Sequence, residues 1–276
     1  MIQLVINADD LGLHPRIDEG IFQGHSTGVV TSATLLATGP TAQGATRRAK
    51  REGLPVGLHL CLTTHLTPAA KTSDVRWLAP GGRFRRNWAE LSLAWLSRLV
   101  PRDEVELEFR AQVARARDLG VEIDHLDTHQ HLHLLPGLTA IVEELASELG
   151  LPLRWPQERP NAHWLVHPKS AMKTALIAGL ARSKKPSTGA RRISALGVFE
   201  AGRLSEARLL RLISKLGEGQ YEISCHPGLT PGVVKHDPTW RYDWESELSA
   251  VTSARVRAAI TDRGIKLVSY RELSSP

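Results

Sequence analysis

The sequence predicts an α/β protein built as a distorted (β/α) barrel of seven to eight mostly parallel strands. Short apolar runs rich in β-formers alternate with longer helical patterns, which is typical of a parallel sheet covered by helices. Seven or eight such units in 276 residues suit a closed or nearly closed barrel better than an open sheet. Acidic residues and histidines also follow the apolar part of several strands, where barrels carry their active sites.

The individual elements follow from the same patterns. The apolar runs predict strands over residues 3–8, 29–37, 56–62, 122–127, 151–155, 193–199, 221–225 and 265–269. Periodic apolar positions predict helices that include residues 102–119, 136–149, 169–182, 205–216 and 246–263. Pro136 marks the start of one helix, and an acidic turn at Glu245 and Glu247 marks the start of the last.

We expect a single barrel domain over residues 1–276, because no internal repeat, low-complexity tract or linker divides the chain. Two segments, residues 63–100 and 156–192, interrupt the alternation and are predicted to be insertions in the barrel. The first contains three tryptophans and a Gly-Gly pair, so we interpret it as a lid or a substrate-facing loop.

The composition is that of a soluble enzyme, with 42% apolar and 23% charged residues. No stretch of about 18 apolar residues is present, which argues against a membrane span. Met1 leads directly into an apolar strand, so we expect no signal peptide and a cytoplasmic location. The two cysteines, Cys61 and Cys225, cannot form a disulfide framework and agree with a reducing compartment.

The formal net charge of +6 is unevenly distributed. Residues 154–192 hold nine Lys and Arg against the single acid Glu158, a net charge of +8, so the rest of the chain sums to −2. Such a segment is either a solvated basic insertion or a surface for an anionic partner, such as a lipid surface or a phosphorylated or nucleotide-linked sugar. We expect no nucleic-acid partner, because aromatic residues are sparse and no recognition motif is present.

The segment from His125 to His133 carries the strongest functional signal. It reads His-Leu-Asp-Thr-His-Gln-His-Leu-His, and its four histidines share one face for as long as the chain stays extended. Clustered imidazoles repel one another when protonated and leave donors unpaired when buried, so a purely structural role is disfavoured. We expect one or two of them to bind a metal ion. Asp127 could then accept a hydrogen bond from a ligand imidazole, and the other histidines could face substrate.

Two further strand ends add carboxylates and an imidazole. Asp9 and Asp10 follow the first apolar run, and His59 lies in an otherwise apolar strand. Each feature alone has a structural interpretation, a turn for the aspartates and a buried core residue for the histidine. Adjacent carboxylates cannot both point into a barrel by simple strand alternation. If both are functional, we expect one to bind metal and the other to transfer protons.

His226 and Arg154 follow the predicted seventh and fifth strands. His226 precedes a Pro-Gly turn and is placed to protonate a leaving group. Arg154 either holds the basic aspartate through a bidentate contact or is a surface arginine. One aspartate and two histidines leave coordination positions open on an ion, and its bound water becomes a nucleophile near neutral pH. The combined set predicts a metal-dependent hydrolase.

Four segments carry a family resemblance: Val5-Ile-Asn-Ala-Asp-Asp-Leu-Gly12, Gly57-Leu-His-Leu60, His125-Leu-Asp-Thr-His-Gln-His-Leu-His133 and Cys225-His-Pro-Gly228. In this order, and over nearly the whole chain, the sequence resembles the YdjC-type carbohydrate deacetylases. The segment beginning at Arg154 is similar to the hopanoid-biosynthesis-associated branch. Leu11 stands where many relatives have Phe, and Gln130 stands where some relatives have His. Both differences concern the rim of the substrate site.

The resemblance implies a distorted barrel that removes acetyl groups from N-acetylated sugars. By position it implies the metal ligands Asp10, His59 and His129, the general base Asp9 and the general acid His226. Arg154 would orient the base, and Asp127, His131 and His133 would contact substrate or support the ligands.

We therefore expect a hydrolase that deacetylates an N-acetylated amino sugar, such as an N-acetylglucosamine oligosaccharide or glycolipid. It would use one divalent ion, Mg²⁺ or Zn²⁺ first, with Mn²⁺ or Co²⁺ as alternatives. A metal-dependent phosphoesterase on a similar barrel is the main alternative, and a sugar-binding protein without catalysis is another. The sequence leaves open whether the sugar is lipid-linked, whether the protein contacts a membrane surface and whether it forms homo-oligomers.

Overall fold

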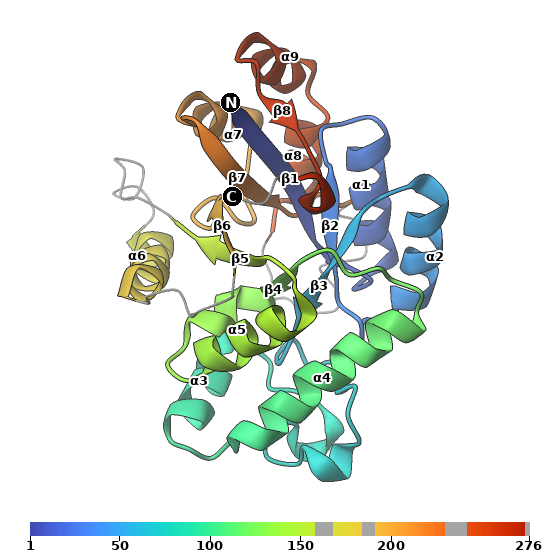
Figure 1. Cartoon of the computed structure of the whole chain (residues 1–276), viewed down its shortest axis with the longest axis vertical. Helices are drawn as coiled ribbons and strands as arrows, with labels where there is room; N and C mark the ends of the chain where they lie inside the picture. Colours follow the sequence, from blue (N-terminus) through green and yellow to red (C-terminus); the bar gives the residue numbers. More distant parts are fainter. Residues whose placement is uncertain (158–167, 184–190, 230–241, 274–276) are drawn as a thin grey trace.

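Seven parallel strands close into a barrel in the computed structural model, which describes residues 1–157, 168–183, 191–229 and 242–273 (Figure 1). The strands are β1 (Ile2–Leu11), β2 (Ser32–Leu35), β3 (Val56–Leu60), β4 (Leu126–Thr128), β5 (Leu153–Pro156), β6 (Arg192–Leu196) and β7 (Gly219–Cys225). Each strand pairs with the next, and β1 pairs with both β2 and β7, which closes the ring. A short extra strand, β8 (Lys266–Leu267), pairs with β1. The predicted α/β barrel is confirmed.

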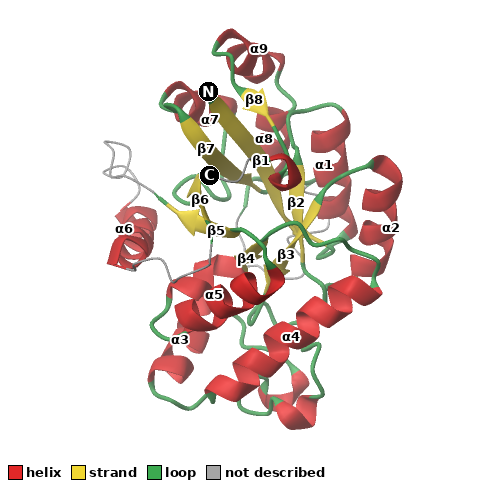
Figure 2. Ribbon diagram, viewed as in Figure 1, coloured by secondary structure: helices red, strands yellow, loops and turns green. Residues whose placement is uncertain are grey.

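Helices surround this barrel (Figure 2). They are α1 (Pro15–Ser26), α2 (Ala42–Glu52), α3 (Trp88–Leu96), α4 (Arg102–Asp118), α5 (Leu138–Leu149), α6 (Pro168–Ser183), α7 (Glu206–Ser214), α8 (Trp244–Val251) and α9 (Ala254–Asp262). In α1, for example, Ile17, Ile21 and Gly24 are buried at helical spacing, because one side of the helix packs on the strands. Within the described ranges, no helix is both long and apolar enough to cross a membrane.

The ring is least regular at β4. This strand has three residues and pairs with β5 through Leu126 opposite Leu153. By contrast, β1 pairs with β7 along its length from Ile2 to Ala8. The weakest pairing of the barrel therefore lies within the histidine segment, directly before His129.

The chain's C-terminal turn closes the end of the barrel where the strands begin. The turn η6 (Tyr270–Glu272) follows β8, and Ser269 and Glu272 form a capping box that fixes it. A small apolar cluster here consists of Val5, Ile193, Val268, Tyr270 and Leu273. The polar site consequently lies at the opposite, carboxyl end of the strands.

Some predicted elements differ from the structure. The helix expected over residues 246–263 is two helices, α8 and α9. α8 ends at Val251, and Ser253 caps α9 by accepting hydrogen bonds from the backbone N–H groups of Arg255 and Val256. The insertion expected at 63–100 consists of η1 (Thr72–Asp74), η2 (Pro80–Gly82) and α3. The one expected at 156–192 lies partly outside the described residues, and its described part contains α6.

Candidate metal and catalytic site

Five strand ends bring the predicted site residues together at the carboxyl end of the barrel. Asp9 and Asp10 lie at the end of β1, His59 in β3, Asp127 in β4, His129 at the start of η3 (His129–Leu134), Arg154 in β5 and His226 directly after β7. Each of these residues is at most 7% exposed. Because the site is shielded from bulk water, each charge interaction within it is strengthened.

Asp9 and Asp10 both face the site because the backbone leaves regular strand geometry between them. Asp10 has a φ of 71°, in the left-handed region, and the register of β1 against β2 shifts between Ala8 and Leu11. Regular alternation would have sent the two carboxylates to opposite faces. A left-handed residue other than glycine costs about 1–3 kcal/mol, a strain that is typical of functional sites.

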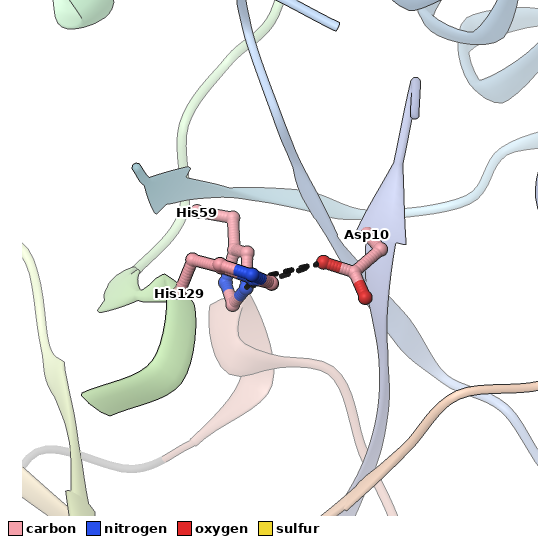
Figure 3. A group of neighbouring side chains, drawn as sticks. All are labelled: Asp10, His59 and His129. Carbon is pink, nitrogen blue, oxygen red and sulfur yellow. Dashed lines mark hydrogen bonds and ion pairs between the residues drawn. The ribbon is translucent and has the colours of Figure 1, made fainter. Parts of the chain in front are cut away.

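Asp10, His59 and His129 point toward one another (Figure 3). Oδ1 of Asp10 lies 3.1 Å from Nδ1 of His129 and 3.6 Å from Nε2 of His59, and these two nitrogens are 3.1 Å apart. Ligand atoms at about 2.1 Å from one ion lie roughly 3.0–3.4 Å from each other, so the three atoms already have the spacing of a ligand set.

The carboxylate of Asp10 also lacks the partners that a buried anion needs. Its Oδ2 has no hydrogen-bond partner among the described residues, and its Oδ1 faces the imidazoles of His59 and His129. Buried polar atoms without a partner are rare in folded proteins. A cation held by these three side chains fits the missing partner.

Asp127 fixes the orientation of His59. Its Oδ1 lies 2.6 Å from Nδ1 of His59, so Nδ1 donates to the carboxylate and Nε2 is directed toward the ligand set. Carboxylates orient metal-binding histidines in this way in many proteins. Burial lowers the pKa of His59, but Asp127 and the two site aspartates outweigh burial and raise this pKa to about 9.

Asp9 is held by four hydrogen bonds. Arg154 donates from Nη1 to Oδ2 at 2.7 Å and from Nη2 to Oδ1 at 2.6 Å, while Asn7 and Thr34 donate to Oδ1 at 2.9 and 3.2 Å. Arg154 is therefore a buried bidentate partner rather than a surface residue. Although burial raises the pKa of Asp9, Arg154 holds this pKa well below its usual range. The result is an ionised carboxylate in a fixed orientation, as a proton acceptor requires.

His226 lies beside Asp9, with its Nε2 3.7 Å from Oδ2 of the carboxylate. On the other side, Glu247 of α8 accepts a hydrogen bond from the backbone N–H of His226 at 2.6 Å and lies 3.6 Å from its Nδ1. Burial lowers the pKa of His226, but Glu247 and the site aspartates raise it above its usual value. The imidazole therefore keeps its proton to higher pH than a free histidine, which suits a general acid.

The histidine segment does not stay extended, so the expectation that its side chains share one face is wrong. β4 ends at Thr128, and Gln130 and His131 have left-handed φ values of 58° and 56° that turn the chain into η3. Of the four histidines, His129 joins the ligand set. His133 is buried with Nδ1 2.6 Å from the Thr128 hydroxyl, and burial lowers its pKa to about 3.

The other two histidines lie outside the group formed by Asp10, His59 and His129. His131 lines a groove together with residues of α3 and α6. His125 lies toward the floor of the barrel, where its ring stacks on Tyr270 at 3.6 Å between centroids and Nδ1 lies 2.6 Å from Asp124. Gly57 is needed beside it, because a Cβ at this position would lie 2.2 Å from the His125 ring.

The site residues predicted from the sequence do not include three buried residues that contact the site, namely Glu222, Glu247 and Tyr270. Glu222 of β7 lies 2.7 Å from Nε of Arg154 and accepts a hydrogen bond from the Tyr270 hydroxyl. A signal for Glu222 was present, because a charged residue within a buried strand requires a partner. Glu247 and Tyr270 carry no comparable signal, since the residues they contact are distant in the sequence.

The chain forms a barrel with a buried cluster of carboxylates and histidines at the carboxyl ends of its strands. This arrangement is that of the α/β-barrel enzymes. Within this class the chain belongs to the YdjC-like protein family, which residues 3–262 match. The predicted family is therefore confirmed.

Full-length relatives and a solved structure agree with this membership. A carbohydrate deacetylase of Brevibacillus brevis is 31% identical over 278 residues, covering 99% of this chain and 100% of the relative. A chitooligosaccharide deacetylase of Serratia marcescens is 30% identical over 278 residues and covers 98% of both chains. A crystal structure from Enterococcus faecalis V583, for which cellobiose-phosphate cleavage has been suggested, superposes with a TM-score of 0.80 at 28% identity, covering 99% of both chains.

Proposed function

We propose that the protein is a metal-dependent carbohydrate N-deacetylase that hydrolyses the acetamide of an N-acetylated amino sugar to acetate and a free amine. The observation that carries this proposal is the position of three possible ligands beside the arginine-bound carboxylate of Asp9 and the imidazole of His226. The deacetylase names of full-length relatives support the same activity.

The roles of the side chains follow from their geometry. When bound by Asp10, His59 and His129, a divalent ion would supply Lewis-acid activation of water and of the acetyl carbonyl. Asp9 accepts the proton of the attacking water, because its contacts with the arginine keep it ionised and oriented. His226 donates a proton to the sugar nitrogen as the C–N bond breaks. Acid and base lie 3.7 Å apart, so both reach one amide group.

We propose one divalent ion per chain, with Zn²⁺ or Mg²⁺ as first candidates and Mn²⁺ or Co²⁺ as alternatives. Two imidazoles favour Zn²⁺ and other transition metals, whereas Mg²⁺ prefers oxygen ligands. A second group of neighbouring donors, Asp9, His59 and Asp127, shares His59 with the first, and Arg154 contacts both of its carboxylates. This sharing supports one ion, and it favours the deacetylase over a phosphoesterase with two ions.

The test of the proposed function is acetate release by metal-stripped protein, with and without each divalent ion. The substrates are N-acetylglucosamine, its short β-linked oligomers and an N-acetylglucosaminyl lipid, with a panel of phosphate esters in parallel. Asp9→Asn is the matched control, because it removes the base and leaves the three ligands in place. Ion-dependent acetate release that is lost in Asp9→Asn supports the proposal. Phosphate release without acetate release overturns it, and sugar binding without either product indicates a protein without catalysis.

We also propose that the sugar is lipid-linked and that α3 and α6 contact its lipid part. Leu93 and Leu96 of α3 are 73% and 58% exposed, and Met172 and Leu176 of α6 are 73% and 54% exposed. Leu176 also lines the groove that contains His131, beside the site. An exposed apolar side chain at the edge of a groove is typical of a surface that binds an apolar partner.

Leu176→Ser tests this surface. We expect kcat/KM to fall by about fivefold for the lipid-linked sugar, because the groove loses apolar contact area, and to stay unchanged for a water-soluble oligomer. Equal values for both substrates would contradict the lipid contact.

Sedimentation with liposomes tests membrane contact, and analytical ultracentrifugation tests homo-oligomerisation. We propose the cytoplasm as the compartment, supported by the free buried cysteines Cys61 and Cys225.

A further inference from the structure

Beneath the site, buried polar contacts run from Asp9 toward the floor of the barrel. Arg154 binds Asp9 through both Nη atoms, and its Nη1 also lies 2.7 Å from Oδ2 of Asp127. Its Nε lies 2.7 Å from Oε1 of Glu222. Arg154, Asp127 and Glu222 are each 0% exposed. One cation thus contacts three carboxylates, and its planar guanidinium is held from two sides.

The second oxygen of Glu222 is held from the floor. Oε2 accepts a hydrogen bond from the hydroxyl of Tyr270, whose ring stacks on His125 with an interplanar angle of 8°. The capping box of Ser269 and Glu272 fixes the turn that carries this tyrosine. Tyr270 therefore reaches the arginine that orients the base through a single carboxylate.

The Nε contact matters because it decides where the two Nη atoms point. A bidentate pair between Arg154 and Asp9 alone leaves both groups free to tilt together. Anchoring Nε to Glu222 removes that freedom, and catalysis by positioned groups is sensitive to displacements of about 1 Å. Nε of Arg154 and Oε1 of Glu222 form a close buried ion pair without hydrogen-bond geometry, so the charge of Glu222 holds this end of the guanidinium.

We propose that Glu222 and Tyr270 are positioning residues for the deacetylation, acting on Asp9 through Arg154. This assignment rests on the function proposed above. Glu222 contacts Arg154 and Tyr270 contacts Glu222, whereas the orientation of the ligand His59 is set by its own contact with Asp127. Changes at these positions therefore lower kcat, while KM and the affinity for the ion stay at wild-type values.

Two conservative variants test the assignment. Tyr270→Phe removes the hydroxyl and keeps the stacked ring, and we expect kcat to fall about tenfold. Glu222→Gln keeps the shape and removes the charge, and we expect kcat to fall about 10- to 100-fold. The matched control is Tyr221→Phe, since this neighbouring tyrosine of β7 donates to the backbone carbonyl of Glu218 at 3.2 Å and should leave kcat unchanged.

A double variant separates positioning from a general structural role. If the hydroxyl of Tyr270 acts through Glu222, the combination of Tyr270→Phe with Glu222→Gln loses no more kcat than Glu222→Gln alone. Additive losses overturn the assignment, as do unchanged kcat values or equal losses of ion affinity. If Glu222→Gln does not fold, the assignment depends on Tyr270→Phe alone: a lower kcat supports it and an unchanged kcat overturns it.

An NMR measurement tests the same contacts without activity. The Nε–H signal of Arg154, identified by its absence in Arg154→Lys, should exchange with water faster in Tyr270→Phe and Glu222→Gln than in the wild type. Tyr221→Phe should leave the exchange rate unchanged, and an unchanged rate in the first two variants overturns the proposed link. Wild-type protein that releases no acetate would instead count against the proposed function, while this measurement would still report on the contacts.

Discussion

The site has two halves that differ in their hydrogen bonding, although the aspartates on which they centre are adjacent in the sequence. In the metal half, Asp10 has a left-handed backbone and an Oδ2 without a hydrogen-bond partner in the described part of the chain. In the proton-transfer half, Asp9 accepts four hydrogen bonds from three side chains. Atoms without partners are suited to receive an ion, whereas a fully bonded carboxylate is suited to stay fixed. Surroundings, rather than residue type, support the different roles that we propose for the two aspartates.

Asp10→Asn breaks the metal half and has the largest expected effect. The amide cannot supply the anionic oxygen of the ligand set, so we expect ion affinity to fall by more than about 100-fold and acetate release to become undetectable. Isothermal titration of the metal-stripped protein and an acetate assay measure the two quantities. An ion affinity equal to that of the wild type would contradict the assignment of this half.

Asp9→Asn sharpens the contrast, because it should damage catalysis and spare the ion. We expect kcat to fall about 10²- to 10⁴-fold through loss of the base, while ion affinity stays within about threefold of the wild type. The same two assays measure both quantities. Parallel losses of kcat and ion affinity would show that the halves are not separate.

Glu247→Gln tests the acid of the proton-transfer half through pH dependence. In the proposed mechanism protonated His226 is the active form, so we expect activity below the pKa of His226 and its loss as pH rises through that pKa. Glu247 raises this pKa, so replacing its charge lowers the pKa and moves the alkaline limb of kcat/KM to lower pH. A pH profile of acetate release measures the shift. An alkaline limb at the same pH in both proteins would contradict this role for His226.

His133→Asn should change stability with little effect on activity. The folded pKa of His133 is about 3, against 6.5 when unperturbed, so the unfolded state binds more protons between these values. Stability should therefore fall as pH drops below 6.5, by on the order of 2 kcal/mol at pH 5. Thermal unfolding at pH 7.5 and pH 5 measures the loss, which should be smaller in the variant. Equal losses in both proteins would rule out His133 as the source.

The barrel and the main members of the site could be predicted, because both depend on patterns local in sequence. Apolar runs define the strands, and the polar residues that follow them meet wherever parallel strands end together. Strand alternation also leads to the expectation that Asp9 and Asp10, if both are functional, divide metal binding and proton transfer between them. The way in which both carboxylates reach the site could not be predicted, because it depends on the left-handed backbone at Asp10.

The remaining features depend on tertiary contacts that the sequence does not display. The histidine pattern predicts a shared face on the assumption of an extended chain, and the left-handed residues Gln130 and His131 end that geometry. Glu247 and Tyr270 lie on elements that follow all the predicted site strands, so only the folded barrel brings them to His226 and Glu222. Support for a site is therefore harder to predict than the residues that carry its chemistry.

The central claim is that one ion, held by Asp10, His59 and His129, serves deacetylation. Its most direct test is a titration of metal-stripped protein with Zn²⁺, and with each alternative ion, that follows acetate release from an N-acetylglucosamine oligomer. We predict that activity rises to a plateau at about one ion per chain and that Asp10→Asn regains none. Full activity without an ion, or a plateau at about two ions per chain, would contradict the claim.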